Sequence, residues 1–513
     1  MARSLGWGAA ALLVAAAAVT RCGGSPRSVT PLPPVGDADG GDPALEVDAS
    51  VPTVDAGNVD AGPVTDLDAG TADAGPSTDG GGSADAGSLD AGQPDAGPPP
   101  PTLVPPSRAD ITWVPASNLV DASADEGGFV WAVSREGTLY LLRPGATHFE
   151  AYGIVNNGHG ASGNRAAGLL SVAGGAPGEA WVGYEGVFQN GESDDPSVPL
   201  DIRQSGGADH FFATPTSVAL DRHVMFWTPP GVLAAEPAGR WKVRSIFSIV
   251  YNHGPSGVPG DVFFGGTHGT AMVHANGDME EHQHAGYNYC PTANWWDCSL
   301  VAGDHHGVAI HPATGNVWIG ADFAEELLPY MTSSPHEWWN AHSCEAPWST
   351  LCDGRSVRTW VNRSVDPERP EWGGRDFAQG MAFDAKGDLW VASYFNGLAR
   401  LRIDPATGKT TAKSQADIAY WNHRDGTAPA WPADPRNGKL WDYVWTVAGD
   451  PDGSIWVGGP HGAWRLVAAT AQWVSYGGLL PGQNVSRITI DPRPGQRAVY
   501  LATNGGLVIY RGK

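Results

Sequence analysis

Two dense groups of histidines are the residues best placed by type and spacing to do chemistry. Among the 16 histidines, His282 and His284 stand in the string HQH, and His305 and His306 stand in DHHG. Two histidines at i and i+2 on a strand point to one side, so His282 and His284 could share a divalent metal with His306 or His268. The competing interpretation, which we favour, makes them polar residues near a loop rim with no metal. Neutral imidazoles there would also suit general-base work.

Other catalytic motifs are absent from the sequence. It contains no G-x-S-x-G elbow, P-loop, H-E-x-x-H, C-x-x-C or C-x-x-C-H. Acidic pairs occur in turns such as DPDG (450–453), where we expect the Asp side chain to cap its own turn. These observations favour a binding module without a cofactor over an enzyme, and a metal-dependent enzyme remains the alternative.

The second unusual feature is a region rich in tryptophan and cysteine, in two long insertions at about 284–304 and 331–376. Rigid aromatic side chains on long loops suit stacking on sugar rings or packing on a protein partner. A self-packed cap, in which the tryptophans bury one another, is the equally weighted alternative. The candidate surface residues are Trp295, Trp296, Trp338, Trp339 and Trp348.

Four of the five cysteines fall in the same insertions. They are Cys290, Cys298, Cys344 and Cys352. An even number of cysteines in an exported chain suggests disulfides, and local pairing of 290 with 298 and of 344 with 352 is the simplest of three connectivities. Zinc binding is the runner-up, although C-x7-C is not a common zinc spacing.

The first 22 residues suit an export signal. Arg3 precedes the small-residue apolar run Leu5 to Val19, which is too short to span a bilayer comfortably. Cys22 follows, and it resembles the lipidated cysteine of bacterial lipoproteins, although Arg21 stands where that pattern has a small residue. A plain secreted protein that loses Cys22 with its signal is the alternative. We expect an outer-membrane-anchored, periplasmic or secreted protein, touching membrane only through such an anchor.

Residues 23–107 predict a disordered acidic tether. The triplet DAG recurs among Pro, Gly, Ser and Thr, with very few large apolar side chains to bury. Residues Val29 to Pro106 hold 14 acidic residues and no Lys or Arg, against a net charge of −24 for all 513 residues. The rest of the chain is therefore only mildly acidic, and no basic face for nucleic acid is indicated.

Residues 108–513 contain a repeated pattern, which sets the fold prediction. An apolar run, a Gly turn and a short strand ending in a small residue recur, for example in LWVAS (389–393), IWVGG (455–459) and VYLAT (499–503). Eight such copies, including VMFWT (224–228), recur at the spacing of four-stranded meanders. The pattern predicts an all-β fold, a single β-propeller of about eight four-stranded blades, with seven as the alternative.

The segments FDAKGDLWVASYFNGLARL (383–401) and GDPDGSIWVGGPHGAWRL (449–466) resemble the two-component-regulator propeller repeat. Streptogramin-lyase and gluconolactonase-like propellers are looser relatives. Streptogramin lyases use a histidine with a metal, but their motif aligns with no position here. Because only three strands follow Val485, we expect the strand-like DITWVPA (110–116) to complete the last blade and close the ring.

The propeller prediction places the candidate binding residues on one rim. Loops that lead into the innermost strands share a face with the turns between second and third strands. The rim candidates are Glu185, His268, His305, His306, Asn396, Tyr443, Trp445, His461 and Asn504. The expected function is a non-enzymatic recognition module for a glycan or protein partner. The alternative is a propeller lyase or lactonase-type hydrolase with a metal and a histidine base on this rim.

Overall fold

The computed structural model describes residues 27–29, 108–187, 198–226, 243–283 without 268, 305–321, 325–328, 378–393 and, with short gaps, 397–512. The expected signal, Cys22, all four other cysteines and the five surface tryptophans of the insertions lie outside these residues. The predicted disulfides and lipid anchor therefore remain predictions. In the described part of the chain no helix is long and apolar enough to cross a membrane.

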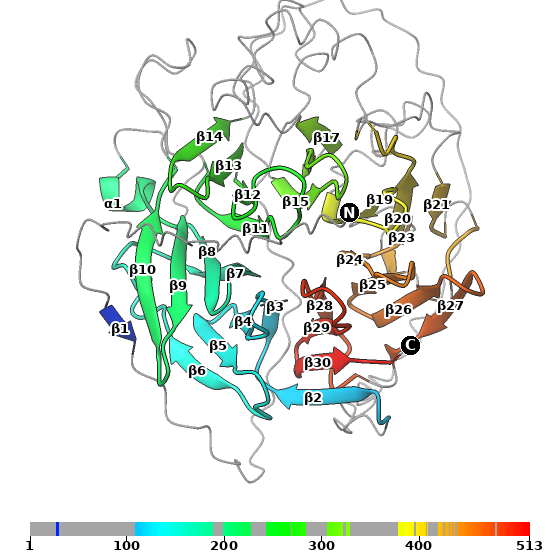
Figure 1. The fold of residues 1–513 in the computed structure, drawn as a ribbon, viewed down its shortest axis with the longest axis horizontal. Coiled ribbons are helices and arrows are strands. Elements are labelled where there is room, and N and C mark those ends of the chain that lie inside the picture. Colours follow the sequence, from blue (N-terminus) through cyan, green and yellow to red (C-terminus); the bar gives the residue numbers. More distant parts are fainter. Residues whose placement is uncertain are drawn as a thin grey trace, which may run out of the picture.

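The described residues form antiparallel sheets that stand around a common axis (Figure 1). The first sheet contains β3 (Leu119–Ala124), β4 (Val130–Ser134), β5 (Thr138–Leu142) and β6 (Glu150–Gly153). The second contains β7 (Gly168–Gly174), β8 (Glu179–Glu185), β9 (Ala208–Ala213) and β10 (Val218–Val224), with β1 (Arg27–Val29) on its outer edge. The third contains β11 (Ile246–Tyr251), β12 (Val262–Gly266), β13 (Gly269–Val273) and β14 (Met279–Gln283). Among the described residues the one helix is the short α1 (Leu200–Arg203).

The remaining sheets follow in chain order. The next contains β15 (His305–Ile310), β16 (Val317–Ala321) and β17 (Glu325–Leu328), and the one after it contains β18 (Ala378–Phe383), β19 (Leu389–Ser393), β20 (Gly397–Leu401) and β21 (Ala419–Trp421). A hairpin of β22 (Asp434–Arg436) and β23 (Lys439–Trp441) precedes β24 (Thr446–Gly449), β25 (Ile455–Gly459), β26 (Gly462–Val467) and β27 (Gln472–Ser475). The last sheet contains β28 (Val485–Ile490), β29 (Val499–Thr503), β30 (Gly506–Tyr510) and β2 (Ile111–Pro115).

The innermost strands meet in a closed circle, as a β-propeller requires. They contact one another in the order β3, β7, β11, β15, β18, β24, β28 and back to β3. Apolar clusters lie between neighbouring sheets, for instance where Trp181 of β8 packs edge-on against Phe264 of β12, with ring centroids 5.6 Å apart. Each sheet thus buries its apolar faces against its neighbours, so no sheet is a separate domain.

The predicted number of blades is wrong. Six sheets of the ring have four strands, one of them with β1 as a fifth on its edge, whereas the sheet β15–β17 has three among the described residues. The described residues therefore form six four-stranded blades, not eight or seven. The string VMFWT does not begin the second strand of another blade, because its first residue, Val224, ends β10, the fourth strand of the second sheet.

The small residue that ends each second strand has a packing reason. Gly183 of β8 and Gly458 of β25 lie under the innermost strand of the next blade. A Cβ at Gly183 would come within 2.7 Å of Ile246 Cβ, and one at Gly458 within 2.7 Å of Val485 Cγ1. The repeat therefore keeps small residues where neighbouring blades approach most closely.

The turn between first and second strands explains the Asp and Trp of the repeat. In three blades a buried aspartate accepts a hydrogen bond from the indole N–H six residues later: Asp125 from Trp131 (3.1 Å), Asp384 from Trp390 (3.0 Å) and Asp450 from Trp456 (3.1 Å). Asp450 also accepts the backbone N–H of Asp452 at 3.3 Å, which confirms the expected turn-capping role in DPDG. Such carboxylates satisfy buried donors and fix the turn.

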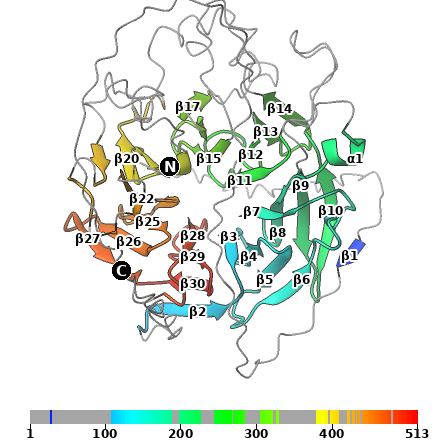
Figure 2. The ribbon, with the colours of Figure 1, turned by 180° about the vertical axis from the view of Figure 1, so that it is seen from behind.

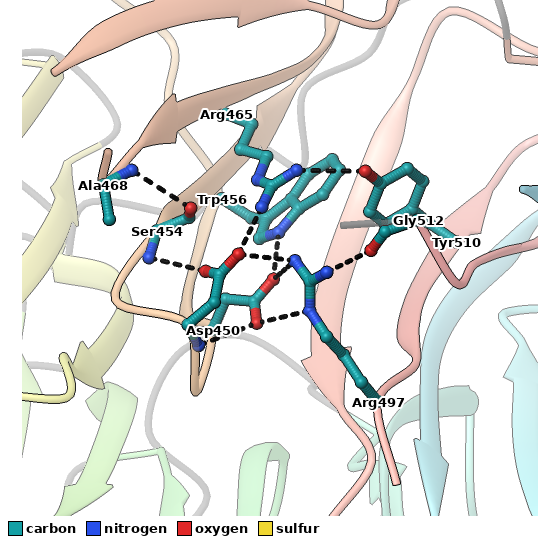
Figure 3. A network of polar contacts seen from close by, with 9 residues as sticks. Asp450, Ser454, Trp456, Arg465, Ala468, Arg497, Tyr510 and Gly512 are labelled. Carbon is teal, nitrogen blue, oxygen red and sulfur yellow. Dashed lines mark hydrogen bonds and ion pairs between the residues drawn. The ribbon is translucent and has the colours of Figure 1, made fainter. Parts of the chain in front are cut away.

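A partly buried ionic cluster joins the sheet β24–β27 to the last sheet, β28–β30 with β2 (Figure 3). Asp450 pairs with Arg497 through bonds of 3.0 and 2.8 Å, and Asp452 pairs with both Arg497 (2.8 Å) and Arg465 (2.5 Å). Arg465 also donates to the hydroxyl of Tyr510 at 3.0 Å. Because Tyr510 ends β30, the cluster holds the carboxyl-terminal strand against the preceding blade.

The predicted closure by the amino-terminal strand is confirmed. β2 pairs antiparallel with β30, from Ile111 opposite Tyr510 to Pro115 opposite Gly506. The indole N–H of Trp113 adds a bond of 2.9 Å to the carbonyl oxygen of Gly505. Figure 2, seen from behind, shows β2 along the outer side of β30. Strand β1 is the one described part of the predicted tether, and it lies on the edge of β10.

We expect deletion of residues 108–116 from the full chain to lower the unfolding temperature by more than about 10 °C. The deletion removes β2 and uncovers the β30 edge and the apolar contacts of Ile111 and Val114. Differential scanning calorimetry measures the change, and deletion of residues 99–107 is the control. An added peptide of residues 108–116 should restore part of the loss. Equal unfolding temperatures for the two deletions would contradict closure by β2.

Candidate functional site

One extra residue interrupts the start of nearly every innermost strand. In β3, Leu119 pairs with Ser134 and Asp121 with Val133, which leaves Val120 as a bulge. The same shift occurs in β7, β11, β15, β18 and β28. A similar bulge precedes β24. Trp445 donates its backbone N–H to the carbonyl oxygen of Gly458, and Gly458 is also the residue that pairs with Thr446. Bulges commonly redirect side chains near functional sites.

These bulged residues mark the channel mouth, and all of them are half-buried. We name them the mouth ring: Val120, Leu170, Phe247, His306, Gln379, Trp445 and Ser486. Two neighbouring members, Phe247 and His306, are in contact, and their ring centroids lie 4.3 Å apart. The members of the ring differ in chemistry. Those from Phe247 to Trp445 are aromatic side chains and one amide, whereas Val120, Leu170 and Ser486 are small or aliphatic.

In three blades the residue after the bulge links neighbouring blades close to the axis. Asp121 accepts the backbone N–H of Val172 at 3.0 Å, and Ser171 donates to the carbonyl of Ile246 at 2.7 Å. Thr446 accepts the N–H of Ile488 at 3.0 Å. These side chains bridge sheets that share no backbone ladder, so they fix the mouth ring in position.

Two predicted rim residues meet in a shallow hollow beside Trp445. Tyr443 and His461 line it, and the other principal walls are Trp431, Val444, Val457 and Trp464. It is only a surface depression: its empty space is about 230 Å³ when the open solvent is counted, and it has no interior space for a water molecule. Tyr443 is buried and His461, in the turn between β25 and β26, is exposed. The hollow thus combines aromatic walls with one solvent-facing imidazole.

A buried carboxylate lies under one wall of the hollow. Asp442, 1% exposed, accepts the indole N–H of Trp431 at 2.8 Å. It also accepts the backbone N–H of His423 at 2.9 Å and contacts His423 Nδ1 at 2.6 Å. The imidazole of His423 is 28% exposed. This arrangement is an Asp–His pair, with the imidazole partly open to solvent, next to the aromatic hollow.

The other rim candidates lie at separate places. Glu185 forms an ion pair of 2.9 Å with Arg135 of the first blade, and Asn504 is exposed in the turn between β29 and β30. His305 is fully buried, whereas His306 stands in the mouth ring. His268 and Asn396 lie outside the described residues. The structure therefore brings together Tyr443 and His461 but not the whole predicted rim.

The proposed metal ligands are not brought together by the described strands. His282 belongs to β14, the outermost strand of its blade, whereas His306 belongs to β15, an innermost strand. His284 lies outside the described residues. Across the part of the chain that the structure describes, no three His, Cys, Asp or Glu side chains are grouped so that they could hold a metal.

Four residues of this site were missed by the sequence analysis: His423, Trp431, Asp442 and Trp464. The segment from Trp421 to Trp445, WNHRDGTAPAWPADPRNGKLWDYVW, is longer than a blade connection needs and is dense in aromatic and polar residues. That composition was the available signal. Trp464 belongs to a strand of the repeat, and the repeat pattern indicates only a packing role for such a residue.

Comparison with known proteins adds little to this description. No protein-family model matches the chain, and no curated protein matches its sequence. Similar solved structures include the extracellular domain of the one-component system BT4673 from B. thetaiotaomicron (11% identity, TM-score 0.43, 79% of this chain), where the matched part spans only 40% of that chain. Others are a chain of the mitotic checkpoint complex (9%, 0.43, 81% and 97%) and the WD40 β-propeller domain of Doa1 (11%, 0.40, 79% and 96%). The propeller assignment rests on the sheet topology above.

We expect the buried carboxyl of Asp121 to make stability fall between pH 4 and pH 7. Burial raises its pKa to about 6 from 3.8, against the opposing effect of Arg487 and two backbone N–H groups. The folded chain then holds a proton that the unfolded chain releases, so the free energy of unfolding drops as pH rises through this window, by on the order of 2–3 kcal/mol.

Urea denaturation at pH 4 and pH 7 measures this change in the free energy of unfolding. In Asp121→Asn the decrease that is due to Asp121 should be absent. Asp491→Asn is the control: the pKa of Asp491 is lowered in the folded chain, so its contribution to stability is lost only as the pH falls below about 4, and this variant should keep the pH dependence between pH 4 and pH 7. Burial opposes the shift there, but the hydrogen bonds from Arg493 lower the pKa of Asp491. An unchanged pH dependence in Asp121→Asn would show that this carboxyl is ionised in the folded chain at both pH values.

Proposed function

We propose that the protein is an exported recognition module that binds a glycan or a protein partner at the channel-mouth face of its propeller. The observation that carries the proposal is the aromatic hollow lined by Tyr443 and His461, with the mouth-ring residue Trp445 next in the chain after its wall residue Val444. Rigid aromatic side chains offer large contact area at low entropic cost, which suits recognition. The fixed inter-blade bonds below the mouth supply a preorganised scaffold.

The wider setting of this proposal comes from the sequence. The signal-like first 22 residues, Cys22 and the acidic segment 23–107 support presentation outside the cell, with or without a lipid anchor. The repeat strings at 383–401 and 449–466 support a propeller of the two-component-regulator type. The two insertions lead directly into β15 and β18, whose first residues lie at the mouth face.

A binding screen with the full chain tests the proposal. Immobilised polysaccharides and peptidoglycan fragments are the glycan probes, and solubilised envelope proteins are the protein probes. We expect Trp445→Ala to weaken binding at least about tenfold, because it removes the largest side chain of the mouth ring. Val474→Ala, an exposed apolar residue on the outermost strand β27, is the control and should bind normally. Equal binding by both variants would refute the mouth face as the binding surface.

A second candidate function is favoured by the Asp–His pair. If His423 donates its Nδ1–H to Asp442, Nε2 carries the free lone pair and can act as a general base. This geometry supports the alternative of a lyase or a lactonase-type hydrolase with a histidine base on the rim. Asp442 would be its positioning residue.

Assays of the full chain with lactones and chromogenic esters, with and without chelator, test this candidate. If the protein is such an enzyme, His423→Gln should lower turnover at least about 100-fold, since general-base catalysis contributes at that scale. His148→Gln, an exposed histidine of the first blade, should leave turnover unchanged. Absence of turnover in the unaltered chain on all substrates would remove this candidate and leave the binding module.

A further inference from the structure

One guanidinium beside the channel mouth has open hydrogen-bond donors. Arg487 of β28 follows the mouth-ring residue Ser486, so it lies one residue deeper along an innermost strand. Its side chain is 18% exposed, and its guanidinium makes no hydrogen bond to the described residues. None of its nitrogens is a buried atom without a partner, so its N–H groups reach solvent.

The open side of Arg487 faces the channel. Within its sheet β28 pairs with β29, and on its two flanks it contacts β24 and β3. Ser486 and Thr489 of the same strand donate to carbonyl oxygens of Leu119 and Ala122 in the first blade, which closes that flank. The approach to the guanidinium is therefore from the channel mouth, past Ser486.

The carboxylate of Asp121 does not satisfy this guanidinium. Nε of Arg487 lies 3.5 Å from Oδ1 of Asp121, which is longer than a charge-assisted hydrogen bond. Both oxygens of Asp121 already accept backbone N–H groups, from Ala122 at 2.8 Å and from Val172 at 3.0 Å. The ion pair therefore positions Arg487 and leaves the N–H donors of its planar fork for another acceptor.

The chemistry of this position selects a carboxylate on a narrow stem. A guanidinium fork matches the two oxygens of a carboxylate. A doubly charged phosphate would be repelled more strongly by the adjacent Asp121. Because Arg487 lies deeper than the mouth ring, a carboxylate at the end of an extended peptide reaches it more easily than one fixed to a sugar ring.

We propose that Arg487 binds the carboxyl-terminal carboxylate of a peptide segment that enters the channel mouth between Trp445 and Ser486. The proposal rests on the recognition function above and narrows its ligand to a protein partner with an exposed carboxyl terminus. The neighbouring strand β24 follows Trp445 and contacts β28, which places this aromatic side chain to pack on the last side chain of the peptide.

Fluorescence anisotropy with the full chain at pH 7.5 tests the site. The probes are an amino-terminally labelled pool of tetrapeptides without Asp or Glu that end in a free carboxylate, and the same pool ending in a carboxamide. We expect saturable binding of the carboxylate pool and at least about tenfold weaker binding of the carboxamide pool. Arg487→Gln should weaken binding of the carboxylate pool to a similar extent. Arg487→Lys, which keeps the charge without the fork, should weaken it less.

A variant of opposite effect and a matched control accompany these measurements. Asp121→Asn removes the competing negative charge, since burial raises the pKa of Asp121 only to about 6, and should strengthen binding of the carboxylate pool about three- to tenfold. Arg493 lies in the turn after β28, at the other end of the same sheet, and pairs with Asp491. Arg493→Gln should therefore leave the affinity unchanged. Thermal unfolding of each variant shows that it is folded.

The outcomes separate this site from the recognition function. Equal binding of the two pools, no binding of either pool, or equal binding by Arg487→Gln and the unaltered chain would overturn the proposal. Binding of hexuronate oligosaccharides or inorganic phosphate that depends on Arg487, in place of the peptides, would overturn the peptide ligand. A partner whose binding is lost in Trp445→Ala but kept in Arg487→Gln would overturn the carboxylate site and leave the recognition function standing.

Discussion

The pairing of β2 with β30 is the constraint on which the rest of the structure depends. A ring of sheets is tied together at its two chain ends when its last sheet takes a strand from the other end of the domain. Ile111–Pro115 supplies that strand, and the contact of Arg511 N–H with the Asp110 carbonyl at 2.8 Å extends it by one bond. Because the innermost strands touch in a circle, the position of each mouth residue depends on this one junction.

Close to the axis, hydrogen bonds from polar side chains connect neighbouring blades, whereas backbone hydrogen bonds connect the strands within a sheet. The oxygens of Asp121, Ser171 and Thr446 bond to the backbone of the following blade. Ser486 and Thr489 of β28 bond back to the carbonyls of Leu119 and Ala122 in the first blade, at 2.7 and 2.8 Å. Burial of such groups is tolerated because each has a partner. These contacts explain why the innermost strands carry polar residues inside an otherwise apolar packing.

The candidate site lies at the long connection between the blades β18–β21 and β24–β27. Residues 422–445 cross from β21 to β24, and Asp442 anchors this crossing by accepting bonds from His423 and Trp431. The carboxylate of Asp442 therefore both holds this connection in place and orients the imidazole of His423. The hollow follows from this anchoring, since Trp431 forms one wall and the sixth blade's Trp464 forms another.

The sequence by itself determined the local features. Repeated Gly turns and short strands that end in a small residue predicted propeller blades, and the missing fourth strand after Val485 predicted closure by DITWVPA. Both follow from short-range rules of turn chemistry and strand pairing. The tertiary structure alone decided how many four-stranded sheets form, because VMFWT resembles a second strand yet ends an outer one. It also decided that His305 is buried and that Tyr443 meets His461, since convergence around an axis depends on the rotation of whole blades, which residue spacing does not encode.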